Sequence, residues 1–149
     1  MIVTFCGHSD FIANEEGKRR ILEILEKEVG NTAAEMFLGG YGAFDEFALC
    51  CCEEYKKNHP NISLVFVTPY LSEEYQRKHL GDQSMRYDDI IYPYIENKPL
   101  RFAISYRNRY MVEKADIVIA CVSNTWGGAY TTYKYAVSKQ KRIFNIANI

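Results

Sequence analysis

Two glycine clusters stand where a predicted strand gives way to a predicted helix. Gly39, Gly40 and Gly42 follow the segment 35–38, and Gly127 and Gly128 follow the apolar run 117–121. A strand that ends in glycines and opens a helix brings free backbone N–H groups and the positive end of a helix dipole to one place, as phosphate sites do. We therefore expect both helix starts to face a common anionic ligand. The competing interpretation is a tight turn, which also needs positive φ and little bulk.

Polar side chains follow the same predicted strands. His8 and Ser9 come directly after Gly7 and the first strand, Asp45 begins the helix after the first glycine cluster, and Thr131 follows the second cluster, with Thr132 beside it. Hydroxyl groups can donate to phosphate, and a carboxylate such as Asp45 can accept from a ribose hydroxyl. His8 either contacts the ligand or only caps the next turn.

The segment 101–114 supplies positive charge to this region. In the predicted helix Asn108 lies on an otherwise apolar stripe, with Arg107 and Arg109 on either side in the sequence. A polar side chain on a buried stripe must find a partner. Phosphate sites often combine backbone donors with one bidentate cation, so we expect Arg107 at the ligand. The alternative is that these arginines form surface ion pairs with acids such as Glu113.

Pro69 and Tyr70 begin a long irregular connection over 69–100, which contains tyrosines at 70, 75, 87, 92 and 94. We predict a short helix over 72–79 and a short strand over 89–92 within it. A long aromatic connection in a small domain is typical of a binding lid. A tyrosine-rich surface used for dimer contacts is the alternative. Tyr70 and Trp126 are the candidates for stacking on a base.

The remaining sequence predicts the elements that position these residues. Apolar runs indicate strands at 2–6, 34–38, 62–68, 117–122 and 142–146, and amphipathic spacing indicates helices at 14–29, 43–58, 101–114 and 129–139. Strands as apolar as 62–68 are typical of a parallel sheet covered on both faces. The sequence thus predicts an α/β fold: one Rossmann-like, doubly wound, mainly parallel sheet of about five strands, with helices on both faces. Ligands bind such sheets at the carboxyl ends of the strands.

Composition limits the classes of partner. At 149 residues the chain has the length of one domain, 1–149. A net charge of −1 and a pI near 6.3 give no basic footprint, so nucleic acid is not favoured as the main partner, and a small molecule is. The start lacks a cationic leader, and no run approaches the roughly 20 apolar residues of a membrane span. We expect a cytoplasmic protein.

The five cysteines do not predict a metal site. Cys50, Cys51 and Cys52 are consecutive in a predicted helix, where side chains point about 100° apart and cannot converge on one tetrahedral ion. Cys6, Cys121 and these residues are instead expected to be reduced and to pack as small hydrophobic groups. Cys50 is the one that could be reactive near the site. No cofactor is expected.

Several of these motifs together resemble one protein family. They are Gly7-His8, Gly39-Gly40-x-Gly42-x-x-Asp45, the strand end Val65-Phe-Val-Thr-Pro-Tyr70, Arg107-Asn108-x-Tyr110-Met111-Val112 and Gly127-Gly128-x-x-Thr131. Their order and spacing resemble the YpsA-like branch of the SLOG superfamily over nearly the whole chain. The resemblance implies a Rossmann-like domain that binds a nucleotide or nucleotide-derived ligand, often as a homodimer or larger homo-oligomer. Related families include LOG-type phosphoribohydrolases, which cleave an N-glycosidic bond, sensors of nucleotide signals, and the DNA-binding DNA-processing protein A family.

The chain departs from the catalytic members of that superfamily. They carry Pro-Gly-Gly-x-Gly-Thr-x-x-Glu where this chain reads Trp126-Gly-Gly-Ala-Tyr-Thr-Thr-Tyr-Lys134, without the proline, the third glycine or the glutamate. A lysine cannot replace a carboxylate that stabilises an oxocarbenium-like centre or activates water. The segment 39–46, which ends in Glu46, is similar in sequence to the catalytic motif. The YpsA-like pattern nevertheless assigns Asp45, and not Glu46, to the site.

The sequence therefore predicts a protein that binds a nucleotide or nucleotide-derived small molecule, as a sensor or by sequestering it. The alternative is a nucleoside 5′-monophosphate N-glycosidase that uses Glu46 or Asp45 as its carboxylate. A third possibility is an interaction module that binds a protein through its exposed tyrosines and has no small ligand.

Overall fold

A computed structural model of the chain describes residues 1–40, 42–70 and 85–147. Its six strands form one parallel sheet in the order β4-β3-β2-β1-β5-β6. From the centre outward they are β1 (Ile2–Gly7), β2 (Ala34–Leu38), β3 (Ile62–Val67) and β4 (Asp89–Ile91) on one side, with β5 (Ile117–Cys121) and β6 (Arg142–Asn145) on the other. The predicted Rossmann-like α/β fold is confirmed. The sixth strand is β4, the short strand expected over 89–92.

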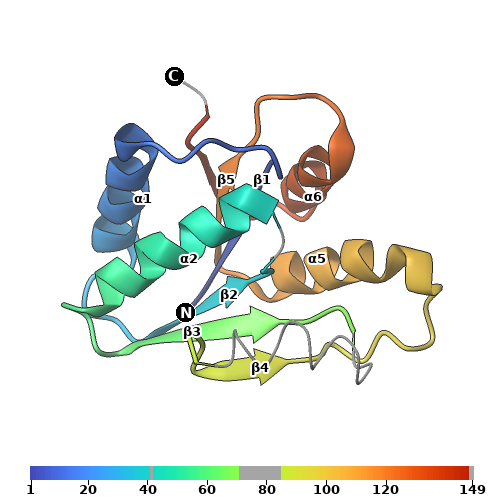
Figure 1. The fold of residues 1–149 in the computed structure, drawn as a ribbon, viewed down its shortest axis with the longest axis horizontal. Helices are drawn as coiled ribbons and strands as arrows, with labels where there is room; N and C mark the ends of the chain where they lie inside the picture. Colours follow the sequence, from blue (N-terminus) through green and yellow to red (C-terminus); the bar gives the residue numbers. More distant parts are fainter. Residues whose placement is uncertain (41, 71–84, 148–149) are drawn as a thin grey trace.

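Helices cover both faces of the sheet (Figure 1). The helices α1 (Glu15–Glu28) and α2 (Gly42–Lys56) lie on one face, and α5 (Ala103–Lys114) and α6 (Gly127–Ser138) lie on the other. A single 3-10 turn, Leu100–Phe102, leads into α5. The helix predicted over 72–79 falls outside the described residues.

The strands supply alternate side chains to two apolar layers because successive residues of a strand point to opposite faces. Val3 and Phe5 of β1 pack with Ile21 and Leu25 of α1 in the larger layer. Cys6 packs in the other layer with Val112 of α5, together with Val118, Ala120 and Ala136. Both faces of β1 are thus buried, as its apolar sequence predicts.

The edge strand β4 is held to β3 by Asp88. Its Oδ2 accepts from the backbone N–H of Leu64 at 2.7 Å and from Nζ of Lys56 at 2.6 Å. Burial raises the pKa of this carboxyl, but the Leu64 N–H and the Lys56 ammonium outweigh it, so the pKa lies below its ordinary value. This carboxylate helps to fix the start of β4, which has three residues.

The chain reverses its direction of travel across the sheet between β1 and β5. It runs outward from β1 through β2 and β3 to β4, then returns through α5 to place β5 on the other side of β1. In doubly wound sheets, the crevice at such a reversal is where ligands bind. Within the described residues, no helix is both long and apolar enough to cross a membrane, and no three potential metal-ligating side chains cluster.

Candidate functional site

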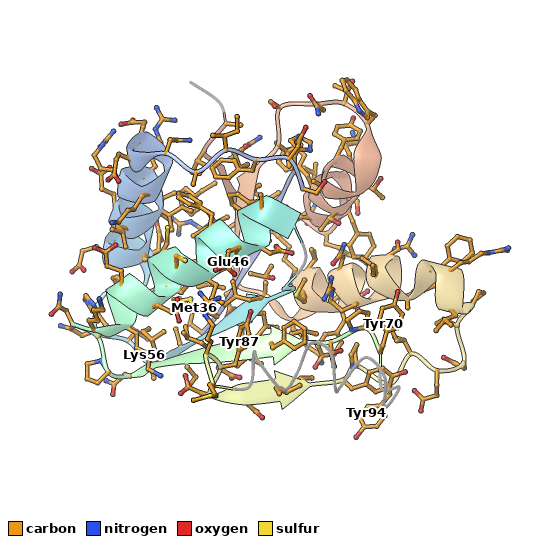
Figure 2. All side chains as sticks on the ribbon, viewed as in Figure 1. Met36, Glu46, Lys56, Tyr70, Tyr87 and Tyr94 are labelled. Carbon is orange, nitrogen blue, oxygen red and sulfur yellow. The ribbon has the colours of Figure 1, made fainter. Side chains whose placement is uncertain are left out.

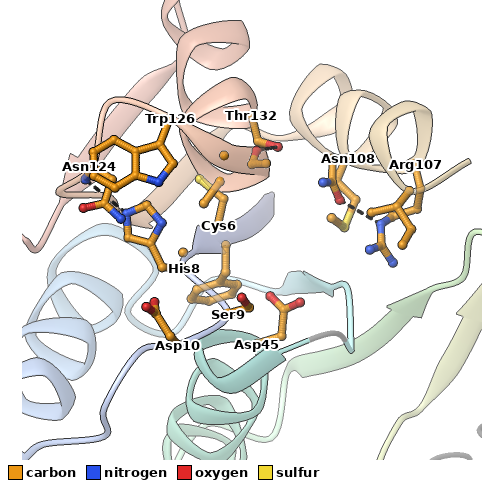
Figure 3. Close-up of a pocket in the computed structure, with 17 residues that line it drawn as sticks. Cys6, His8, Ser9, Asp10, Asp45, Arg107, Asn108, Asn124, Trp126 and Thr132 are labelled. Carbon is orange, nitrogen blue, oxygen red and sulfur yellow. Dashed lines mark hydrogen bonds between the residues drawn. The ribbon is translucent and has the colours of Figure 1, made fainter. Parts of the chain in front are cut away.

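A pocket of about 380 Å³ lies at the carboxyl ends of β1 and β5 (Figure 3). It is where the chain reverses direction, so fold topology and cavity position agree. The first strand and its loop, α2, α5 and the start of α6 all contribute to its wall. The lining residues are Phe5, Cys6, Gly7, His8, Ser9, Asp10, Asp45, Ile104, Arg107, Asn108, Met111, Asn124, Trp126, Gly127, Gly128, Ala129 and Thr132.

His8 ties together the two loops that form this pocket. Its Nε2 accepts from the backbone N–H of Ser123 at 3.1 Å and from that of Asn124 at 3.2 Å. This hydrogen-bond network assigns the ring proton to Nδ1. His8 lines the pocket, and it also fixes the loop between β5 and α6.

The glycines of the first cluster, and Gly7 beside it, are required by the protein's own packing. A Cβ on Gly7 would lie 2.3 Å from the ring of Phe44, and one on Gly42 would lie 3.0 Å from Cα of Ser9. Gly42 also has a φ of +84°, which side chains disfavour. These contacts press the start of α2 against the loop after β1, where the N–H of Ala43 donates to the Ser9 carbonyl at 3.1 Å.

Gly39 packs against charged groups instead. A Cβ there would lie 3.2 Å from the guanidinium carbon of Arg107 and 3.2 Å from a carboxylate oxygen of Asp45. Neither Gly39 nor Gly40 nor Gly42 lines the pocket, whereas Asp45 does. The first cluster therefore shapes the site by allowing close packing around it.

Arg107 is a buried structural link between α5 and the sheet. Only 1% of its surface is exposed, and its Nη1 donates to the carbonyls of Gly39 at 2.8 Å and Val67 at 2.7 Å. Its Nε donates to Oδ1 of Asn108 at 2.9 Å. The guanidinium thus holds the ends of β2 and β3 together, and Arg107 also lines the pocket. Asn108 lines the pocket as well, with its amide nitrogen donating to no described residue.

The second glycine pair differs because the space beside it is empty. A Cβ on Gly127 or Gly128 would meet nothing within 4 Å, and both residues line the pocket. Gly127 has a φ of +90°, which side chains disfavour, so its backbone conformation requires glycine. The backbone of Gly128 has no such requirement. The described packing gives no reason for glycine at position 128.

The start of α6 also has backbone donors without a side-chain cap. Trp126 occupies the N-cap position with no side-chain hydrogen bond, and the first turn holds no acidic residue. The first N–H groups of any α-helix lack an intrahelical partner, and they carry the positive end of its dipole. In α6 they lie at the pocket wall beside Gly127 and Gly128. This end of the pocket is suited to an anion.

Other groups set the polarity of the pocket. Asp10 and Asp45 stand on either side of Ser9 (Figure 3), and the indole of Trp126 is 67% exposed at the rim. Burial, and then the charge of Asp45, raise the pKa of the Cys6 thiol to about 12, so Cys6 is a neutral, weakly nucleophilic group there.

Several predicted site residues lie elsewhere. Pro69 and Tyr70 line a separate groove with Tyr92 and Leu100, on the side of β4 (Figure 2). Thr131 faces the groove between α5 and α6, and its hydroxyl donates to the Gly127 carbonyl at 3.0 Å. Thr132 lines the pocket in its place.

The alternative catalytic carboxylate is also outside the pocket. Glu46, on α2 (Figure 2), pairs with Arg86 at 2.9 Å. Arg86 also reaches Glu53 at 2.8 Å and lies 3.7 Å from Sγ of Cys50. Burial and the charge of Glu46 raise the pKa of Cys50, which gives no sign of an activated thiolate.

In comparisons by sequence, no protein-family model and no curated protein matches the chain. Solved structures do match its fold. DNA processing protein A from Helicobacter pylori, described for its mode of binding single-stranded DNA, has a TM-score of 0.65 at 18% identity over 97% of this chain. DNA processing protein A from Streptococcus pneumoniae has a TM-score of 0.65 at 17% identity over 96%. The chain shares the Rossmann-like fold of the matched parts of these two proteins.

The chain spans 64% and 49% of the lengths of these two DNA processing proteins. A third structure, of the protein TM1055, has a TM-score of 0.56 at 14% identity, over 95% of this chain and 71% of that one. At such identities the likeness establishes the fold alone. It confirms the Rossmann-like fold expected from the SLOG resemblance, and the YpsA-like branch stays a prediction.

Some residues that line the pocket are not predicted by the sequence motifs. Asp10 directly follows the predicted site residue Ser9, and Asn124 lies two residues before Trp126. Both follow strand ends that the topology brings together, so extending each loop to the next helix would have included them. Cys6 is a strand residue, and only the period of two along β1 indicates that its side chain lies on the same face as α5 and α6.

Proposed function

We propose that this protein binds a nucleotide or nucleotide-derived small molecule in the pocket, with a phosphate group at the start of α6. The observation that carries the proposal is Gly128. It lies at an uncapped helix start and lines a pocket, and its missing side chain leaves space that no described protein atom fills. Backbone N–H groups with that much clearance are the usual setting for a phosphate.

The rest of the pocket can accommodate the other parts of a nucleotide. The exposed indole of Trp126 is placed to stack on a base at the rim. The carboxylate of Asp45 can accept from ribose hydroxyls, and the amide nitrogen of Asn108 can donate. A pocket of about 380 Å³ falls in the range of small-molecule sites.

The likeness to a protein that binds single-stranded DNA supports a ligand built from phosphate, sugar and base. Binding without turnover is favoured because Glu46 is paired with Arg86 outside the pocket. An N-glycosidase reaction would have to use Asp45 or Asp10, the two carboxylates that line the pocket.

The test compares Gly128→Ala with Ser138→Ala, a control at the opposite end of α6. Because a Cβ at position 128 has free space, Gly128→Ala should keep the fold and even stabilise the helix, by about 0.5–1 kcal/mol. Its methyl group would occupy the proposed phosphate position. Melting temperature is measured with nucleoside monophosphates, dinucleotides, cyclic nucleotides and ADP-ribose, with chromatography of the products.

The proposal expects a ligand that raises the melting temperature of wild type and Ser138→Ala, is recovered intact, and has a much smaller effect on Gly128→Ala. Release of free base that is lost in Asp45→Asn would establish the N-glycosidase instead. If no nucleotide raises the melting temperature of wild type, the proposal is wrong and the interaction module takes its place.

A further inference from the structure

Charge is divided unequally along the chain. Residues 98–142 contain nine lysines and arginines and two acidic residues, a net charge of +7. The whole chain carries −1, so the other residues carry −8. The basic segment includes α5 and α6, whereas α1 and α2 lie on the opposite face. The small total charge is therefore the sum of one strongly basic stretch, 98–142, and an acidic remainder of the chain.

The cations on the two faces are held differently. On the face of α1 and α2, Lys18 pairs with Glu54 at 2.9 Å, and Arg19 pairs with Glu16 and Glu23. On the other face, a set of exposed cations has no ion pair with any carboxylate of the described residues. It consists of Lys98, Arg101, Arg109, Lys114, Lys134 and Lys139. Their positive charge is therefore available to a partner.

Several of these cations alternate with aromatic rings. Lys98 lies 5.0 Å from the ring centre of Tyr106, Arg109 lies 5.4 Å from the rings of both Tyr106 and Tyr135, and Lys139 lies 5.4 Å from Tyr135. We call Lys98, Tyr106, Arg109, Tyr135 and Lys139 the cation–ring row. It crosses from the approach to α5, over α5, to the end of α6.

The rings position the cations without neutralising them. A ring attracts a cation through its quadrupole and carries no net charge. Glu113 is the carboxylate that contacts the row among the described residues, and it accepts from the hydroxyl of Tyr135. The guanidinium of Arg109 is exposed between two rings. It therefore offers both charge and a flat stacking surface.

A groove lies beside this row. Arg109 and Tyr135 line a groove of about 210 Å³ between α5 and α6, together with Lys134 and Thr132. Thr132 also lines the pocket at the chain reversal. Among the described residues, the lining of the groove contains no acidic residue, so phosphates can lie there beside Arg109 and Lys134.

We propose that the cation–ring row and the adjoining groove bind single-stranded nucleic acid. Phosphates would contact Lys98, Arg109, Lys134 and Lys139, and a base would stack on the Arg109 guanidinium or a neighbouring ring. Cations interleaved with flat groups are what unpaired strands need, because their bases are free to stack. A duplex keeps its base faces buried. The row lies outside the pocket, so the inference does not depend on nucleotide binding there.

Charge also argues against a second copy of the chain on this surface. A two-fold dimer joins the same patch on both subunits, and here it would bring two strongly basic regions together. Like charges facing one another across an interface are unfavourable. The basic surface is better matched by a polyanion.

The test uses fluorescence anisotropy with a labelled 20-nucleotide oligo(dT) strand at 50 to 200 mM salt. For three or four phosphate contacts the slope of log K against log[salt] should be about −2 to −3, which corresponds to a roughly 30-fold loss of affinity over that range. Arg109→Ala should reduce the magnitude of the slope by about 0.7. Arg109→Lys should retain the slope but bind more weakly, because the flat stacking surface is lost.

Lys139→Ala and Lys27→Ala form a matched pair. Both remove one exposed lysine, the first from the row and the second from the opposite face, on α1. We expect weaker binding of oligo(dT) only for Lys139→Ala, with an unchanged melting temperature in both variants. Equal affinities in the two variants would overturn it. So would competition by polyglutamate as effective as unlabelled oligo(dT), which would point to an acidic protein partner.

The two proposals fail separately. Gly128→Ala tests the pocket and leaves the row intact, so it should keep oligo(dT) binding. Arg109→Ala alters the row and should keep the melting-temperature response to a mononucleotide. If duplex DNA of the same length binds as tightly as the single strand, stacking on exposed bases is wrong.

Discussion

The guanidinium of Arg107 on α5 lies 2.8 Å from the carbonyl oxygen of Gly39 at the end of β2. The same nitrogen donates to the carbonyl of Val67 at 2.7 Å. One side chain of α5 therefore links the ends of β2 and β3. Arg107 is more than a ligand-facing charge, because both carbonyls would lose this donor if it were removed.

Arg107→Lys should lower the free energy of unfolding by about 2–3 kcal/mol, because a single ammonium cannot reproduce the planar set of donors on two carbonyls and Asn108. Urea denaturation measures the change. The control is Arg109→Lys, which is exposed and should alter stability by less than about 0.5 kcal/mol. If the two variants are equally stable and Arg107→Lys loses only ligand binding, Arg107 has the ligand-binding role expected from the sequence and no structural one.

Gly7→Ala should destabilise the protein by roughly 1–3 kcal/mol, because the new Cβ would lie 2.3 Å from the Phe44 ring. Adding Phe44→Leu to Gly7→Ala should recover part of this loss. Thermal unfolding of the two single variants and the double variant gives the coupling energy between the sites. Purely additive effects would show that the close approach is not the cause.

His8→Phe removes the acceptor for the backbone N–H groups of Ser123 and Asn124. We expect faster amide hydrogen exchange at these two residues and a loss of about 1 kcal/mol in stability. The nearby amide of Val122 donates to Oδ1 of Asn145 and serves as an internal control. If the exchange of Ser123 and Asn124 is unchanged, His8 does not hold this loop.

The attachment of β4 should weaken in acid. The pKa of Asp88 is lower in the folded protein than its ordinary 3.8, so its contribution is fully present above about pH 4 and is lost as the pH falls through the folded-state value. Asp88→Asn should therefore cost stability at pH 6, by about 1 kcal/mol because the side chain is 43% exposed. The difference from wild type, measured by urea denaturation, should shrink below pH 3. A difference that persists there would assign the effect to something other than the charge.

The fold was predictable because its signals are local and repetitive. The apolar runs of β1, β3 and β5 and the amphipathic spacing of α1 each indicate one element, and alternation of strands and helices restricts the topology. The residues at strand ends were placed near one another for the same reason. His8, Asp45, Asn108 and Gly128 all line the pocket.

The side-chain details were less predictable, because they depend on contacts between distant segments. Both clusters begin with a pair of glycines, yet a Cβ on Gly42 would lie against Ser9, whereas a Cβ on Gly128 would meet nothing within 4 Å. Thr131 and Thr132 are neighbours in sequence, but 100° around a helix places only Thr132 at the pocket. The total charge gave no sign of the basic surface because the positive charge of residues 98–142 is cancelled by the negative charge of the other residues.

The central position of β1 has a consequence for the order of assembly. His8 and its partner Asn124 are 116 positions apart, and β1 pairs with β5 over a similar separation, whereas its pairing with β2 spans about thirty residues. During synthesis β1 emerges before β5, so β1 acquires its second neighbour only after the whole segment between them has been made. One edge of β1 is therefore unpaired while that segment is synthesised, and unpaired strand edges are prone to aggregate. The pocket comes into existence only when β5 docks, so a ligand that fits it can bind only a chain that has completed folding.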